Sequence, residues 1–209
     1  MRVLIATVTA GGGHLAAAAA MDEAWRALRP EDVVDRVDLV KFFSPLHRKI
    51  HADGYVALVN HAPDIWGMMF GKTDHPEVAR RLNRLRRIFP SKSRGMFERY
   101  VKDFEPDVVL CTHYLPLEVL EGMRKKAAKE HTGARTLVRS NVRAEGDPKQ
   151  VSPPGAIGDR CGLKSARRPM AVTIVTDFEA HALWMSPCAD LYCVAAEETK
   201  ARLDRKSVV

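Results

Sequence analysis

The sequence predicts an α/β fold built on a mostly parallel β-sheet. Short apolar runs rich in β-branched residues span Val3–Val8, Val33–Val40 and Val108–Thr112, and two more begin at Met170 and Leu191. Such runs, bounded by turns, are typical of parallel strands that are buried on both faces. Helical sequences such as "HLAAAAAMDEAWRAL" and "PLEVLEGMRKKAAKEH" alternate with them. This alternation of strand and helix is what a βαβ architecture requires.

The composition is that of a soluble globular chain. Its 209 residues are 46% hydrophobic and 28% charged, and no uninterrupted apolar run approaches the ~20 residues that a membrane span needs. The four cysteines include no CxxC pair, so we expect reduced thiols and a cytoplasmic location. The rival interpretation is a secretory leader at the N-terminus, but glycines interrupt its apolar run too early.

The positive charge is concentrated in one segment. The formal net charge is +7, and the stretch Lys72–Lys102 holds ten Lys or Arg against three acids. Just before it, "FFSPLHRKIHADGYVALVNHAPDIWGMMFGK" is rich in aromatic and apolar residues. We expect an insertion at about 41–102 and, from its Gly and Pro content, an irregular loop at about 140–169. No nucleic-acid-binding motif accompanies the basic stretch, so we expect no nucleic-acid partner.

The quartet "GGGH", Gly11, Gly12, Gly13 and His14, lies where the first strand turns into the first helix. Glycines there let the backbone approach a ligand closely, and free amides at a helix start attract anions. A histidine at this edge of the sheet has an imidazole suited to general base catalysis. Three readings stay open: a catalytic loop, a plain structural turn, and a dinucleotide fingerprint.

The dinucleotide reading uses Gly11, Gly13 and Ala16 as a GxGxxA pattern. Asp35 or Asp38 would then be the ribose-binding acid, about 20 residues further on. It predicts an NAD-dependent oxidoreductase.

A second polar cluster follows the fourth apolar run in "TIVTDFEAHALW", where Asp177, His181 and Trp184 stand. Carboxyl ends of parallel strands share one edge of a sheet, so this cluster is expected beside His14. Alternatively, Asp177 caps a helix and Trp184 belongs to the core.

These motifs, in this order, resemble a known family. "TAGGGHLAAAAAMDEAW", "LVKFFSP", "PDVVLCTHYLP" and "VTIVTDFEAHALWMSPCADLYCVAAEETKARL" resemble the N-terminal domain of the processive diacylglycerol glucosyltransferases and monogalactosyldiacylglycerol synthases. These are relatives of the peptidoglycan lipid-intermediate N-acetylglucosaminyltransferase. The resemblance implies the N-terminal half of a GT-B fold, a Rossmann-like domain that binds the lipid acceptor.

The resemblance also implies roles for the residues that match. His14 would be the general base that deprotonates diacylglycerol, which then attacks a UDP-hexose with inversion. Gly11, Gly12 and Gly13 would shape the acceptor site, and Asp177, His181 and Trp184 would line it. No metal or cofactor is implied, and the UDP-hexose enters as the donor substrate.

The insertion is expected to contact an anionic membrane surface, which makes the protein cytoplasmic and peripherally membrane-associated. The expected contacts are aromatic or apolar side chains and arginines: Phe42, Phe43, Trp66, Met69, Phe70, Arg80, Arg84 and Arg87. The alternative is that the aromatic residues are core and the arginines form a solvated helix face.

The acceptor domain is expected to span 1–203, followed by a tail at 204–209. The donor-binding C-terminal domain of the family is not in the sequence, so we expect a fragment, a truncated gene product or half of a split enzyme with a separate donor-binding half, and in each case a chain that is inactive alone. A non-catalytic membrane-binding module remains the third alternative.

Overall fold

The computed structural model describes residues 1–9, 12–49, 54, 60–75, 91–140, 168–177 and 180–207. It confirms the predicted α/β class. The described elements follow in this order: β1 (Arg2–Thr7), α1 (Gly12–Leu28), β2 (Val33–Asp38), the 3-10 helix η1 (Leu39–Phe42), α3 (Pro63–Thr73), α5 (Ser91–Phe104), β3 (Val108–Cys111), α6 (Tyr114–Ser140), β4 (Met170–Ile174), the 3-10 helix η2 (Ala182–Trp184), β5 (Leu191–Cys193) and α7 (Glu197–Ser207).

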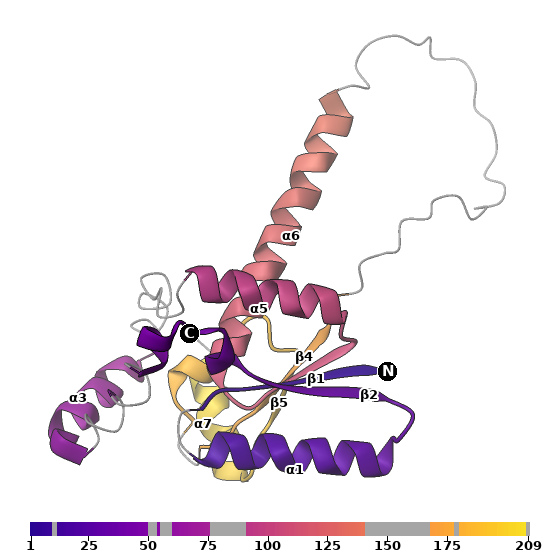
Figure 1. Cartoon of the computed structure of the whole chain (residues 1–209). Coiled ribbons are helices and arrows are strands. Elements are labelled where there is room, and N and C mark those ends of the chain that lie inside the picture. The colour runs from indigo at the N-terminus through magenta and orange to yellow at the C-terminus, as the bar shows by residue number, and fades with distance from the viewer. Residues whose placement is uncertain are drawn as a thin grey trace, which may run out of the picture.

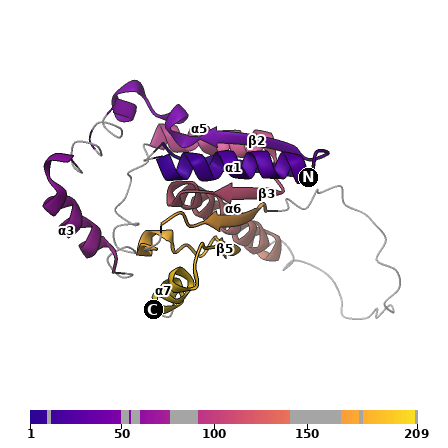
Figure 2. The same cartoon turned by 90° about the horizontal axis from the view of Figure 1, so that it is seen from below.

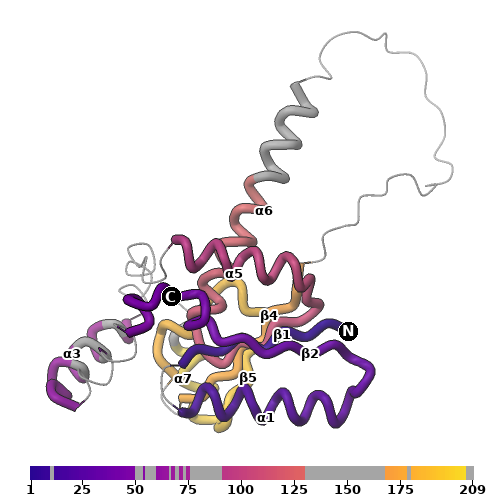
Figure 3. The backbone as a smooth tube through the Cα atoms, in the orientation of Figure 1, coloured from indigo at the N-terminus to yellow at the C-terminus, as the bar shows by residue number. Residues whose placement is uncertain are grey.

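The five described strands form one sheet in the order β2-β1-β3-β4-β5, and every neighbouring pair is parallel. The chain runs from β1 through α1 to β2 on one side of β1 (Figures 1 and 3), then crosses to β3 on the other side. The direction of winding therefore reverses between β1 and β3. In open α/β sheets, ligands bind beyond the carboxyl ends of the strands at such a switch point.

Helices cover both faces of the sheet. Figure 2 shows α1 in front of the strands, with α5 and α6 behind them. Side chains alternate accordingly along β1, because successive residues of a strand point to opposite faces. Val3 and Ile5 pack with Ala18 of α1, whereas Leu4 and Ala6 pack with Phe97 of α5. This two-sided burial explains why the central strands read as continuous apolar runs.

The segment after β2 corrects two expected membrane contacts. Phe43 is 6% exposed and belongs to the core, and Phe42 packs against Phe97 and Tyr100 of α5, with ring centroids 5.7 Å apart in each pair. Both rings therefore pack within the fold: Phe43 is buried, and Phe42 is partly buried against α5. Most of the stretch 91–102, expected as the end of the insertion, forms α5 itself, which covers the sheet.

The other expected membrane contacts are only partly described. Arg80, Arg84 and Arg87 lie outside the described residues. Trp66, Met69 and Phe70 belong to the backbone of α3, but their side chains lie outside the description. On the same helix Ile65 and Met68 are 51% and 53% exposed. Among the helices that the structure describes, none is both long and apolar enough to cross a bilayer.

Arg124 of α6 holds the segments that precede β4 and β5 by hydrogen bonds. Its guanidinium donates to the carbonyl oxygens of Cys188 and Pro169 and to the Asp190 carboxylate, the last at 2.7 Å. Burial acts to raise the pKa of Asp190, but the Ala171 amide and the Arg124 guanidinium outweigh it and hold that pKa below its usual range. The ion pair joins α6 to the segments that lead into β4 and β5.

Candidate functional site

The site lies where β1 and β3 end, and His14 is its central residue. His14 stands in the first turn of α1 and is partly exposed. Its ring Nδ1 lies 2.7 Å from the carbonyl oxygen of Thr112, directly after β3, and 2.9 Å from the hydroxyl of Thr176, two residues after the end of β4. One imidazole nitrogen therefore meets two strand ends that are far apart in the sequence.

The partners of Nδ1 fix the tautomer of His14. A carbonyl oxygen can only accept a hydrogen bond, so at 2.7 Å the proton must be on Nδ1. In the neutral ring, Nε2 then carries the lone pair. His14 thus presents an unprotonated nitrogen, which is the form that a general base needs.

Two threonine hydroxyls fasten the backbone of His14 to the sheet. Thr112 Oγ1 donates to Thr7 Oγ1 at 2.8 Å, and Thr7 Oγ1 donates to the carbonyl oxygen of His14 at 3.2 Å. Both threonines are buried, with 0% and 2% exposure. The first turn of α1 is therefore held to the ends of β1 and β3, and the ring and backbone of His14 are fixed together.

The glycines before His14 are not required by the local geometry. Gly12 and Gly13 are exposed and helical, and a Cβ added at either would meet no heavy atom within 4 Å. Neither has the positive φ that would demand glycine. Leaving aside the chain neighbours and the backbone of α1, neither position is crowded, so packing in the fold does not require glycine there. Gly11 lies outside the described residues.

The second predicted cluster comes close to His14 through Trp184. The indole is 1% exposed and its ring centroid lies 6.2 Å from that of His14. Its Nε1 donates to the exposed carboxylate of Asp177 at 2.9 Å. Trp184 therefore supports the site from within the fold, and Asp177 lies on the outside.

His181 belongs to the same segment, and its side chain caps the start of η2. It is 4% exposed, and its Nδ1 accepts the Leu183 amide at 3.1 Å at the start of η2. An amide can only donate, so this nitrogen is unprotonated and His181 is held neutral. Whether Asp177, His181 or Trp184 touches an acceptor stays a prediction.

Sequence reasoning missed His113. It follows Thr112, is 6% exposed, and its ring meets that of His14 edge to face at a centroid distance of 4.8 Å. Its Nδ1 accepts the Leu115 amide at 3.1 Å, so it too is held neutral. The signal that could have found it is its position directly after a buried strand next to β1.

The acids of the dinucleotide reading are used within the chain. Asp38 accepts hydrogen bonds from the Val40 amide at 2.9 Å and from both the amide and hydroxyl of Thr9. Asp35 accepts from the hydroxyl of Tyr100. Both carboxylates therefore already have hydrogen-bond partners within the chain, and the dinucleotide reading stays untested.

The sequence matches the family model for monogalactosyldiacylglycerol (MGDG) synthase over residues 14–137 and 162–208, more than half of the chain. The chain belongs to the MGDG synthase family. This family consists of glycosyltransferases of glycolipid biosynthesis, and the α/β sheet is the Rossmann-like arrangement expected of the N-terminal half of a GT-B fold. No curated protein and no solved structure matches the chain.

The MGDG synthase match includes both sides of the site. His14 opens the first matched range, which also contains Thr112 and His113, and the second contains Thr176 and Trp184. The unmatched interval, 138–161, falls largely within the expected irregular loop. Within the described residues, no group of three or more His, Cys, Asp or Glu could hold a metal ion.

Proposed function

We propose that the chain is the acceptor-binding domain of a glycosyltransferase that moves a hexose from a UDP-sugar to diacylglycerol with inversion. One observation carries this proposal: the Thr112 carbonyl oxygen lies 2.7 Å from Nδ1 of His14 and holds the proton there, which leaves Nε2 of the neutral ring as a base. Membership of the MGDG synthase family supports the class of reaction.

In the proposed reaction, Nε2 of His14 takes the proton of the free acceptor hydroxyl. The hydroxyl oxygen bonds to the anomeric carbon as the bond to UDP breaks, and UDP leaves with that electron pair. A single displacement inverts the anomeric centre. Thr112 O and Thr176 Oγ1 stabilise the imidazolium that forms, because oxygen acceptors interact more strongly with a charged donor.

The test is transfer of labelled hexose from UDP-glucose or UDP-galactose to diacylglycerol vesicles, with the chain alone and with a donor-binding half of the family added. We expect labelled glycolipid with the added half and a loss of about 10²–10⁴-fold in His14→Ala, the usual contribution of a general base. His61→Ala, which removes an exposed imidazole elsewhere, is the matched control. Transfer that survives in His14→Ala removes the assignment of the base.

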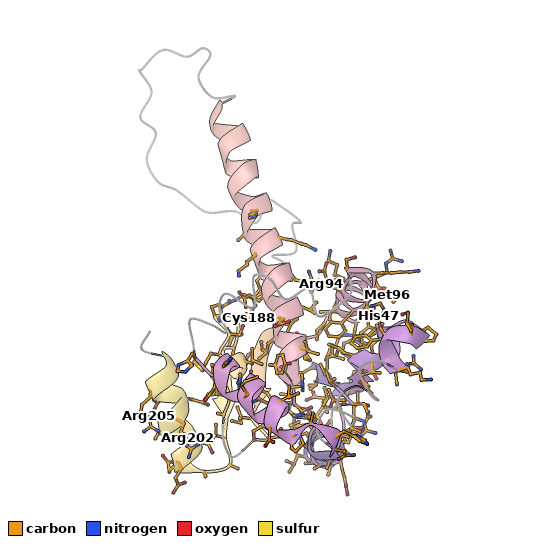
Figure 4. The ribbon with its side chains drawn as sticks, turned by 90° about the vertical axis from the view of Figure 1, so that its left-hand side faces the viewer. His47, Arg94, Met96, Cys188, Arg202 and Arg205 are labelled. Atoms are coloured by element: carbon orange, nitrogen blue, oxygen red, sulfur yellow. The ribbon has the colours of Figure 1, made fainter. Side chains whose placement is uncertain are left out.

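The membrane contact is proposed for a surface that the structure does describe. The segment 41–49 and the start of α5 carry five cations and no carboxylate, and we name these the basic surface: Lys41, Arg48, Lys49, Lys92 and Arg94. Leu46 and Met96 stand among them, 66% and 40% exposed. Figure 4 shows Arg94, Met96 and His47 on the same side of the molecule. Cations with exposed apolar side chains suit an anionic bilayer, at about 1 kcal/mol for each cation near the surface.

Sedimentation with vesicles of anionic lipid tests the basic surface. We expect binding that weakens with salt and is reduced by charge reversal in Arg48→Glu with Lys92→Glu. Lys200→Glu with Arg205→Glu, on α7, makes the same change in net charge and is the control, because Figure 4 shows Arg205 on the opposite side of the molecule from Arg94 and Met96. If the control and the test variants lose vesicle binding equally, binding depends on the net charge of the chain and not on the basic surface.

A further inference from the structure

We propose that Thr176 is a positioning residue for the His14 base, an inference that rests on the proposed function. Its hydroxyl oxygen lies 2.9 Å from Nδ1, the nitrogen that also meets the Thr112 carbonyl oxygen at 2.7 Å. The two oxygens lie on different elements, after β4 and after β3. Together they hold the ring from two strand ends.

The direction of the Thr176 bond follows from the tautomer. A threonine hydroxyl can donate or accept, but Nδ1 already carries the proton that the Thr112 carbonyl requires. Thr176 Oγ1 must therefore accept from Nδ1–H, in a bond shared between two acceptors. Its own hydroxyl proton is left to donate to another group.

Neutral oxygens take the place that a carboxylate occupies in many catalytic histidine pairs. In the described part of the chain, no carboxylate contacts His14. Asp177, the next residue after Thr176, accepts the Trp184 indole instead. Thr176 and the Thr112 carbonyl are thus the groups that orient the ring and stabilise its charged form. Thr112 meets the His14 ring only through its main-chain carbonyl. Of the two contacts to the ring, a side-chain substitution can therefore remove only that of Thr176.

The chain also offers a matched control for a threonine-to-valine change. Thr173 lies in β4, three residues before Thr176, is fully buried, and its hydroxyl has no hydrogen-bond partner among the residues that the structure describes. Removing an unsatisfied buried hydroxyl costs nothing or stabilises. Thr173→Val therefore controls for the effect of the substitution on this strand, without touching His14.

The first measurement does not depend on enzymatic activity. Nitrogen-15 NMR of the histidine side chains, with His14→Gln to identify the resonance, should show neutral His14 with its proton on Nδ1, protected from exchange with water. In Thr176→Val this proton should exchange at least about tenfold faster, as expected when a bond to a potentially charged donor is lost. Thr176→Ser and Thr173→Val should stay close to the wild type. A wild-type proton on Nε2, or equal exchange in Thr176→Val and the wild type, overturns the proposal.

The second measurement uses the transfer assay with the added donor-binding half. Thr176→Val should lower kcat about 10- to 100-fold with KM nearly unchanged, because the bond is strongest to the charged ring, and Thr176→Ser should restore most of it. An unchanged kcat, or a loss that appears in KM alone, counts against a positioning role. If no preparation transfers sugar, the proposed function fails while the NMR result still decides whether Thr176 positions the ring.

Discussion

Replacing Gly13 with alanine distinguishes an open acceptor site from a structural glycine turn. Gly13 is helical, lacks a positive φ, and a Cβ there meets no heavy atom within 4 Å. Alanine at a conformationally compatible glycine stabilises a protein by about 0.4–1 kcal/mol, mainly because it restricts the unfolded chain. We therefore expect Gly13→Ala to raise the free energy of unfolding by this amount and Tm by about 1–4 °C.

The same methyl group should impair function. It would project into the open space beside His14 where the acceptor is proposed to bind. One additional carbon in a fitted site changes kcat/KM by about tenfold or more, so the variant should be more stable and less active. Urea unfolding followed by circular dichroism gives the stability, and hexose transfer to diacylglycerol vesicles with the added donor-binding half gives the activity.

Gly95→Ala is the control for this experiment. Gly95 lies in α5, is exposed, and also has nothing within 4 Å of an added Cβ. It should give a comparable gain in stability with kcat/KM unchanged. The reasoning is refuted if Gly13→Ala lowers the free energy of unfolding by about 1 kcal/mol or more, or if its kcat/KM equals that of Gly95→Ala.

Three further predictions concern stability and thiol chemistry. Arg124→Met should lower the free energy of unfolding by about 2–4 kcal/mol in urea, because it removes the side-chain donor to two carbonyls and one of the donors to the Asp190 carboxylate, which keeps the Ala171 amide. The lowered pKa of Asp190 means that its contribution is present above the usual aspartate pKa and is lost as pH falls from about 4 through the folded value. Acid unfolding of Asp190→Asn should therefore depend less on pH in that range than wild type. Of the three cysteines that the structure describes, Cys193 is exposed whereas burial raises the pKa of the Cys188 thiol. A thiol reagent should therefore modify Cys193 before Cys188 and reach Cys188 only on unfolding.

The sequence predicted the strands well because their signal is local. β1 and β3 lie inside the sheet, so every position after the first of β1, and all of β3, is buried, and all of these residues except Thr7 are apolar. The prediction for the last strand ran too long, since an edge strand of three residues, Leu191–Cys193, has no such pattern to mark its end. α6 begins earlier than predicted because Pro116 is tolerated in a first turn.

The predictions that were wrong depended on distant partners. Phe42 and Phe43 look like lipid contacts when they are read beside the apolar insertion. Phe97 and Tyr100, which bury Phe42, lie more than fifty positions away in the sequence. Residue type alone cannot tell an aromatic ring that packs under a helix from one that faces solvent.

The sequence predicted at which edge of the sheet the site lies, but it did not predict the contacts within the site. The rule that parallel strands share a carboxyl edge placed His14 near the Asp177–Trp184 segment, and the structure brings His14 and Trp184 together. The Thr112 carbonyl that fixes the tautomer is a main-chain atom, and any residue at that position would supply it. The state of the base therefore depends on where β3 ends, which only the fold determines.

Two further hydrogen bonds connect the segment beside His14 to α3, which lies in the expected insertion. Trp184 holds Asp177, the neighbour of Thr176, and η2, which contains Trp184, begins at Ala182, whose amide donates to the Asp74 carboxylate at 2.9 Å. Asp74 is the C-terminal cap of α3, the helix with exposed apolar side chains. An enzyme that takes its acceptor from a bilayer must hold its base at a set distance from the segment that meets the lipid. Under the proposed function, the hydrogen bond between Asp74 and Ala182 fixes the distance between the base and α3, since it attaches the end of α3 to the short segment that supports the base.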